Sequence, residues 1–171
     1  PKEEEKGSTA SLVRGMAAQA VEKGYPVAGF DVYAQSDVLP GSGLSSSAAC
    51  EVLLGVIENH LFCGGALDPV TIARMGQKAE NGYFGKASGL MDQTASSVGG
   101  VVAIDFAEPS APMVRPLRVD LDALGYALCI IDSGADHADL TPEYDAIPRE
   151  MREVAACFGK TVLREVEEAD V

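Results

Sequence analysis

A glycine- and serine-rich loop that runs directly into an amphipathic helix constrains this chain more than any other feature. The loop reads Leu39-Pro-Gly-Ser-Gly-Leu-Ser-Ser-Ser-Ala-Ala49, and a helical pattern follows it at once. Glycine lets backbone amides approach an anion closely, and the first turn of a helix has unpaired N–H donors at the positive end of its dipole. The segment is therefore a candidate phosphate-binding loop, and the alternative is an ordinary loop with a serine cap.

The composition describes a globular chain rather than a disordered one. Its 171 residues predict one domain with a sizeable core, and 13 Lys and Arg against 26 Asp and Glu give a net charge of -13. This charge argues against nucleic-acid or membrane partners, so any phosphate must be held locally. The four cysteines form no CxxC pair, which favours thiols in a reducing compartment. Neither a leader nor a membrane-spanning run is recognisable, so a cytoplasmic location is expected.

The hydrophobic periodicity predicts helices and strands in separate blocks. Helices are expected from a cap at Ser8 or Thr9 to Gly24, from the loop to Cys63 (with Val52, Leu53, Val56 and Leu61 at helical spacing), from Asp68 to about Asn81, and from Pro142 to about Phe158. Strands are expected at 27–34, 101–106, 113–119 and 126–132, the last as a central strand. Block order favours an α+β two-layer domain over a doubly wound sheet. Residues 1–8 read as a charged, frayed start.

Two common classes of nucleotide-binding loop can be excluded for this segment, because it lacks their characteristic residues. It has no lysine of the GxxxxGK[ST] type and no GxGxxG pattern, so the common nucleotide loop and the dinucleotide fingerprint are both excluded. Its triple serine, Ser45 to Ser47, places hydroxyls just inside the helix start. A hydroxyl there can ligate the Mg²⁺ that accompanies nucleotide phosphates, since that ion prefers oxygen ligands.

Two acidic residues in glycine-flanked segments are further candidates. Glu80 lies in Ala79-Glu-Asn-Gly82, and Asp92 lies in Gly89-Leu-Met-Asp-Gln93. Phosphoryl transfer needs one carboxylate to hold metal and another group to orient or deprotonate the accepting hydroxyl. Most acids in such a composition are simply solvated. The apolar neighbours of Asp92 favour a functional role for it, because a charge in that setting needs a partner.

A third cluster, Asp132-Ser-Gly-Ala-Asp-His-Ala-Asp139 with Glu143 and Tyr144, imitates a metal site. It fits no calcium-loop spacing, and a hydrogen-bonded turn is the favoured interpretation.

Together these segments resemble the galactokinases of the GHMP small-molecule kinase superfamily in order and approximate spacing, from about Ser11 to Lys160. The loop carries the resemblance to the superfamily, and Gly89-Leu-Met-Asp-Gln93 with the Glu143-Tyr144 pair carries that to the sugar kinases. The resemblance implies the two-layer, ribosomal-protein-like N-terminal domain of that superfamily over residues 9–160, with residues 161–171 beginning a linker. It also implies transfer of the γ-phosphoryl group of ATP to the C1 hydroxyl of galactose.

The same resemblance implies a role for each matching residue. Nucleotide phosphates would be held by the loop residues Pro40, Gly41, Ser42, Gly43, Leu44, Ser45, Ser46 and Ser47. Ser47 and Glu80 would bind Mg²⁺, and Asp92 would face the C1 hydroxyl as the catalytic base. Gly89, Asp92 and Tyr144 would contact the sugar.

The chain departs from these kinases in what it does not contain. The family's Gly-Glu-His-Thr-Asp-Tyr segment, the arginine that supports the catalytic aspartate, and the C-terminal glycine-rich motif are not found. The chain is therefore expected to be an internal piece that is inactive alone. Two alternatives stay open: another GHMP kinase, acting on mevalonate or homoserine, and a galactokinase-like sensor that binds sugar without turnover. The oligomeric state is not indicated.

Overall fold

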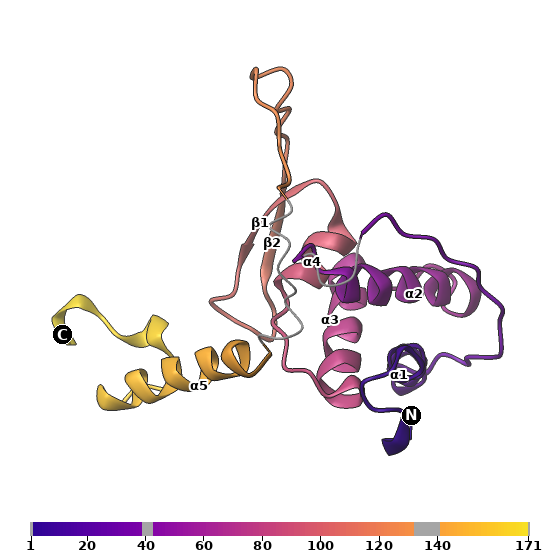
Figure 1. The fold of residues 1–171 in the computed structure, drawn as a ribbon, viewed down its shortest axis with the longest axis horizontal. Helices are drawn as coiled ribbons and strands as arrows, with labels where there is room; N and C mark the ends of the chain where they lie inside the picture. Colours follow the sequence, from indigo (N-terminus) through magenta and orange to yellow (C-terminus); the bar gives the residue numbers. More distant parts are fainter. Residues whose placement is uncertain (1, 39–42, 132–140, 171) are drawn as a thin grey trace.

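A group of four packed helices forms the body of the molecule, and a β-hairpin and a further helix extend from it (Figure 1). The computed structural model describes residues 2–38, 43–131 and 141–170. Within these residues the elements are η1 (Glu3–Glu5), α1 (Thr9–Glu22), α2 (Ser46–Phe62), α3 (Pro69–Ala79), η2 (Glu80–Phe84), α4 (Met91–Val98), β1 (Val101–Asp105), β2 (Met113–Leu117), α5 (Thr141–Cys157), η4 (Leu163–Glu165) and η5 (Glu168–Asp170).

The core lies between α1, α2 and α3. Met16 and Ala20 of α1 are buried against Ile72 and Met75 of α3, which confirms the inward faces that the periodicity predicts. Gly55 of α2 lets the three helices approach, because a Cβ at this position would lie 2.6 Å from Ile72 Cγ2 and 2.8 Å from Met16 Cε. A side chain larger than hydrogen would therefore push α2 away from its neighbours.

The orientation of α2 differs from the one its apolar pattern suggests. Leu53, Val56 and Leu61 are exposed, whereas Glu51 and Glu58 are fully buried. The close approach at Gly55 explains the difference, because residues 51, 55 and 58 lie on one face of the helix at i, i+4 and i+7. Two carboxyl groups are therefore carried into the interior.

The start of α3 follows its sequence signals. The Asp68 side chain caps the helix by accepting a hydrogen bond from the Thr71 N–H at 3.0 Å, and Pro69 takes the first helical position. The end differs from the expected stop near Asn81, because the chain continues through the π-helical turn η2. Gly85 closes that turn with φ of 88°, where its N–H donates to the Glu80 carbonyl at 2.8 Å.

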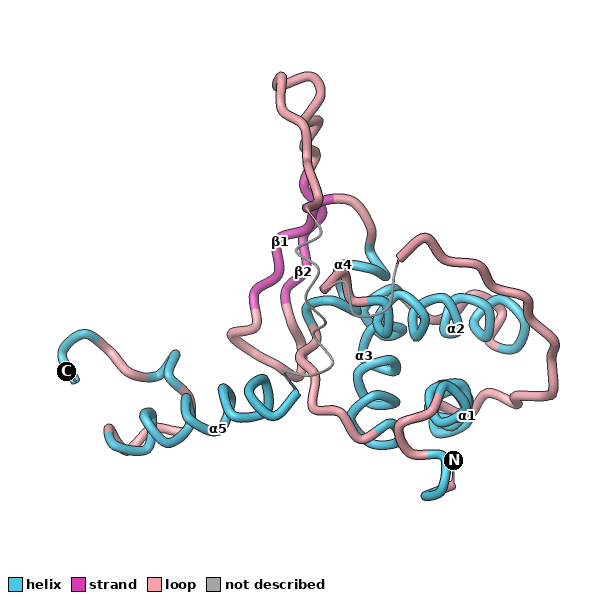
Figure 2. Tube along the Cα trace, in the orientation of Figure 1, coloured by secondary structure: helices cyan, strands magenta, loops and turns pink. Residues whose placement is uncertain are grey.

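Two of the four expected strands form. β1 and β2 pair antiparallel, from Val101 opposite Leu117 to Asp105 opposite Met113. The strand predictions for 27–34 and 126–132 are wrong over their described residues, which are loop (Figure 2). Neither segment has a neighbouring strand among the described residues, so alternation alone does not satisfy its backbone donors and acceptors. Ile131 is 89% exposed, which is the opposite of a central strand.

The segment after α1 is held by side chains instead of by a sheet. It runs along the outside of α1 and α2 (Figure 1), and the Phe30 ring packs on Phe62 with centroids 5.7 Å apart. It therefore joins α1 to the loop before α2 as an extended strap.

The combination of helices with a small sheet agrees with the α+β class. In the part of the chain that the structure describes, the helices are all too short or too polar to cross a bilayer.

Candidate functional site

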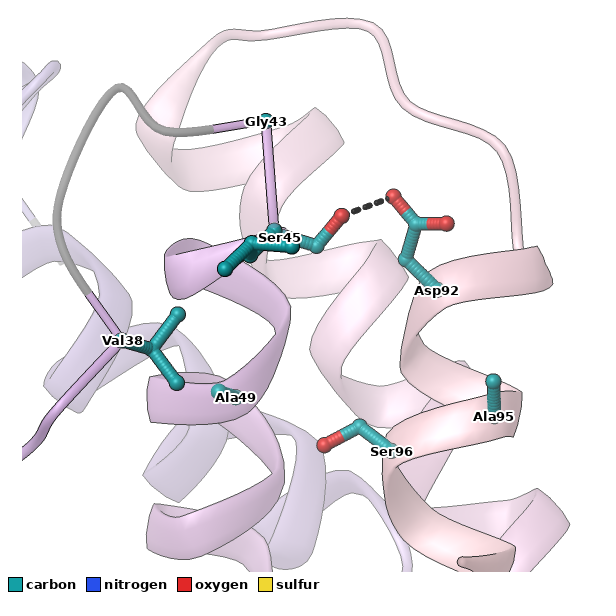
Figure 3. A pocket seen from close by; sticks show the side chains of 8 residues that line it. Val38, Gly43, Ser45, Ala49, Asp92, Ala95 and Ser96 are labelled. Carbon is teal, nitrogen blue, oxygen red and sulfur yellow. Dashed lines mark hydrogen bonds between the residues drawn. The ribbon is translucent and has the colours of Figure 1, made fainter. Parts of the chain in front are cut away.

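The start of α2 and the first turn of α4 meet through a side-chain hydrogen bond. Ser45, the residue directly before α2, donates a hydrogen bond from its hydroxyl to Asp92 Oδ2 (Figure 3). Ser45 has a left-handed backbone, with φ of 58° and ψ of 51°, which is unusual for a residue other than glycine. Strained backbone of this kind concentrates at functional sites, where the surrounding structure holds it.

A pocket of about 480 Å³ opens beside this contact. Its walls come from the loop and α2 on one side and from α4 on the other (Figure 3). The lining residues are Val38, Gly43, Leu44, Ser45, Ala49, Asp92, Ala95 and Ser96. The carboxylate of Asp92 and the hydroxyl of Ser45 therefore lie in this pocket, next to the N-terminus of α2.

The hydroxyl of Ser45 does not cap α2. Its side chain makes no hydrogen bond to the first-turn amides, because it is turned toward Asp92 instead. The N–H groups at the start of α2 are thus not taken up by their own cap residue. At the positive end of a helix dipole such groups can receive an anion.

Three buried side chains, one of which follows Asp92 directly in the sequence, form a polar cluster. Gln93 Nε2 donates to Glu51 Oε2 at 3.2 Å and to Glu80 Oε2 at 3.0 Å. Each of the three side chains is 2% exposed or less. Lys86, at the surface, places its Nζ 3.5 Å from Glu80 Oε1. One amide therefore links two carboxyl groups, of which Glu80 has the cation of Lys86 beside it.

Within the cluster, Glu51 keeps its proton at neutral pH. Burial, together with the nearby charge of Glu80, raises the pKa of Glu51 to about 8, while the Gln93 hydrogen bond and Lys86 act in the opposite direction. Glu51 Oε1 has no hydrogen-bond partner among the described residues. Glu51 is therefore a neutral acid at pH 7, which avoids two adjacent buried negative charges.

The structure brings some of the sequence-predicted site residues together and separates others. Gly43, Leu44 and Ser45 line the pocket with Asp92, while Ser46 and Ser47 are half-buried in the first turn of α2. Glu80 lies in the buried cluster, and Gly89 is exposed just before α4. Tyr144 is half-exposed on α5 and is not among the lining residues. Pro40, Gly41, Ser42 and the cluster at 132–139 lie outside the described residues.

Two functional candidates escape the sequence reasoning. The sequence assigns Glu51 no role, Gln93 stands out only as the end of the Gly89-Leu-Met-Asp-Gln93 motif, and the helix α4 itself is not predicted. An available signal is the pair of acids, Glu51 and Glu58, within the otherwise apolar α2 sequence, since charges at such positions need partners or protons.

The two residues predicted to bind Mg²⁺, Ser47 and Glu80, do not line the pocket, and both carboxylate oxygens of Glu80 already have partners in Gln93 and Lys86. Ser47 offers a hydroxyl oxygen and Glu80 a carboxylate, the hard ligands that this ion takes. Among the described residues no three His, Cys, Asp or Glu side chains gather as a metal cage. Mg²⁺ in nucleotide sites uses one or two carboxylates with phosphate oxygens, so a sparse set of this kind fits it.

Comparison with known families assigns the class of protein. Residues 11–100, more than half of the chain, match the model of the GHMP kinases N terminal domain. The chain belongs to the GHMP kinases, and this confirms the resemblance noted in the sequence.

Its relatives are more specific. The chain is 38% identical over 153 residues to the galactokinase of Streptomyces coelicolor, covering 88% of the chain and 38% of that protein. It is 39% identical over 98 residues to the galactokinase of Clostridium tetani, covering 57% of the chain and 25% of the relative. It is 35% identical over 173 residues to that of Mycobacterium tuberculosis, covering 94% and 46%. The chain thus spans less than half the length of each of these relatives.

Proposed function

We propose that this chain is part of a sugar kinase that transfers the γ-phosphoryl group of ATP to the C1 hydroxyl of galactose. The observation that carries the proposal is the contact between Ser45, at the end of the glycine loop, and Asp92. It joins an anion-binding helix start to a carboxylate that is open to solvent. The match to the GHMP kinases and the galactokinase relatives support the same assignment.

In this proposal each element of the pocket has one task. The loop residues from Pro40 to Ser47 hold the phosphates of ATP, with backbone N–H groups at the start of α2 as donors. Asp92 orients the C1 hydroxyl of galactose and accepts its proton as the oxygen attacks the γ-phosphorus. The Ser45 hydrogen bond restricts the Asp92 carboxylate to the orientation that faces the pocket.

The remaining residues bind metal and sugar. Ser47 and Glu80 would hold Mg²⁺, which supplies positive charge to the phosphate oxygens when bound. Gly89 and Tyr144 would contact galactose beside Asp92. Residues 9–160 would form the two-layer N-terminal domain, and these residues alone would not complete the active site, because the relatives are more than twice as long as the matched part.

The test is an assay of ADP release by the longest protein encoded in the reading frame that contains these residues. Galactose with Mg-ATP is expected to give turnover and galactose 1-phosphate, identified by ³¹P NMR. Turnover with mevalonate or homoserine instead would replace galactose as the substrate. Galactose binding without ADP release would make the protein a sensor. The 171-residue chain is assayed in parallel, and appreciable turnover by it would refute the proposed need for further residues.

A further inference from the structure

The polar cluster of Glu51, Glu80 and Gln93 connects the three elements on which the site is built. Glu51 comes from α2, one turn beyond Ser47, and Glu80 begins η2 at the end of α3. Gln93 comes from α4 and directly follows Asp92. The loop, the proposed metal ligand and the proposed base are therefore each tied to the same buried amide.

The packing leaves this cluster little freedom. A Cβ at Gly76 of α3 would lie 3.0 Å from Glu51 Oε2 and 3.5 Å from Gln93 Cγ. The hydrogen of glycine is what fits there, so the side chains of Glu51 and Gln93 lie directly on the α3 backbone. Close packing leaves these side chains few alternative rotamers, although Glu51 Oε1 and Gln93 Oε1 have no hydrogen-bond partner among the described residues.

The amide of Gln93 uses both of its N–H donors on carboxyl oxygens. An apolar side chain of similar size at position 93 would leave Glu51 and Glu80 without the amide that bonds to both of them. Because Gln93 lies in the first turn of α4, the loss of these two bonds would release the turn that carries Asp92. Asp92 itself is exposed, and its contact with Ser45 across the pocket depends on where this turn lies.

We propose that Gln93 is a positioning residue, whose carboxamide joins Glu51 to Glu80 and thereby fixes the turn of α4 that presents Asp92 to Ser45. This inference rests on the proposed function in taking Asp92 as the group that faces the sugar hydroxyl. Displacement of a reacting group by about 1 Å can lower a rate by about a hundredfold.

Three variants separate positioning from stability. Gln93→Met removes both N–H donors at similar volume, and Glu51→Gln replaces the neutral acid by an amide of the same shape. The double variant Glu51→Gln/Gln93→Met is expected to recover most of the thermal stability lost in Gln93→Met, because an amide again faces Glu80. The double variant does not restore the hydrogen bonds that Gln93 of α4 makes to residues 51 and 80. Gln19→Met is the matched control, since Gln19 of α1 is 5% exposed and donates to Glu22 on its own helix.

In the kinase assay, Gln93→Met and the double variant are expected to lower kcat by about 10- to 100-fold. The KM for ATP is expected to change by less than about twofold in both, since the loop is untouched. Gln19→Met is expected to keep the wild-type kcat. A double variant that regains both stability and kcat would overturn the inference, because Gln93 would then act only on the stability of the fold.

A measurement that needs no turnover tests the positioning role independently. In the 171-residue chain, proton NMR is expected to show a nuclear Overhauser contact between the side chains of Ser45 and Asp92 that is lost in Gln93→Met and in the double variant. Persistence of that contact in both variants would refute the positioning role. Absence of galactose turnover in the wild-type protein would refute the proposed function alone, and the NMR result would still decide the role of Gln93.

Discussion

Ser45 and Asp92, 47 residues apart in the sequence, are joined by a hydrogen bond from the serine hydroxyl to a carboxylate oxygen. The bond connects the residue before α2 with the first turn of α4. The serine has a left-handed backbone, so a conformation that costs free energy is maintained where the two helices meet.

Substitutions at Ser45 separate the cost of its backbone from the value of its hydroxyl. Ser45→Ala loses the hydrogen bond and keeps a Cβ in the left-handed region, whereas Ser45→Gly loses the bond and relieves the backbone. We expect Ser45→Gly to be more stable than Ser45→Ala by about 1 kcal/mol in urea unfolding. Equal stabilities, or the reverse order, would show that the left-handed backbone at Ser45 costs nothing.

Asp92 is expected to matter for turnover and little for folding. Asp92→Asn keeps the shape of the side chain and removes its basicity, so kcat should fall by about 10²- to 10⁴-fold in the full-length kinase. The thermal midpoint should stay near that of the wild type, because Asp92 is exposed. A variant that keeps most of its kcat would leave Asp92 without the proposed role.

The helices α1, α2, α3 and α5 could be predicted from the sequence because their signals are local, whereas α4 is not predicted. The Asp68-Pro69 start of α3 and the apolar face of α1 each follow from residues within one helix. The segments at 27–34 and 126–131 could not, since a strand forms only where a partner meets its backbone, and alternation does not report the partner. The small hairpin succeeds because its two strands are close neighbours in the sequence.

The site divides in the same way. The loop and Asp92 are visible as motifs, so their meeting in one pocket was open to prediction. The cluster of Glu51, Glu80 and Gln93 was not, because the rotation of α2 that buries Glu51 depends on the close approach at Gly55. That close approach depends on α1, α2 and α3 together, so the hydrophobic periodicity of α2 alone does not reveal it.

Ser47 is expected to act on the metal rather than on the sugar. In the full-length kinase, Ser47→Ala should lower the rate at low Mg²⁺ and recover partly as Mg²⁺ is raised, with the KM for galactose nearly unchanged. Ser97→Ala in α4 is the control, since Ser97 is not part of the proposed site. A rise in the galactose KM alone, with no change in Mg²⁺ dependence, would show that Ser47 does not bind the metal.

Glu58 makes the stability of the chain depend on pH. It is fully buried, neither of its carboxyl oxygens has a hydrogen-bond partner among the described residues, and burial raises its pKa from the ordinary 4.5 to about 7. The folded state therefore keeps a proton that the unfolded state releases, and stability falls as the pH rises from 4.5 through 7. Glu51, whose pKa is also raised, adds a slope of the same sign up to about pH 8.

Glu58→Gln is therefore expected to reduce this loss between about pH 5 and pH 8 by about 1 to 3 kcal/mol, while the part that belongs to Glu51 remains. The measurement is urea unfolding of the 171-residue chain at a series of pH values. Glu150→Gln, at an exposed position of α5, serves as the matched control and should leave the slope unchanged. A slope that is the same in Glu58→Gln and in the wild type would mean that Glu58 is ionised in the folded protein, and its burial would then require a cation that binds beside it.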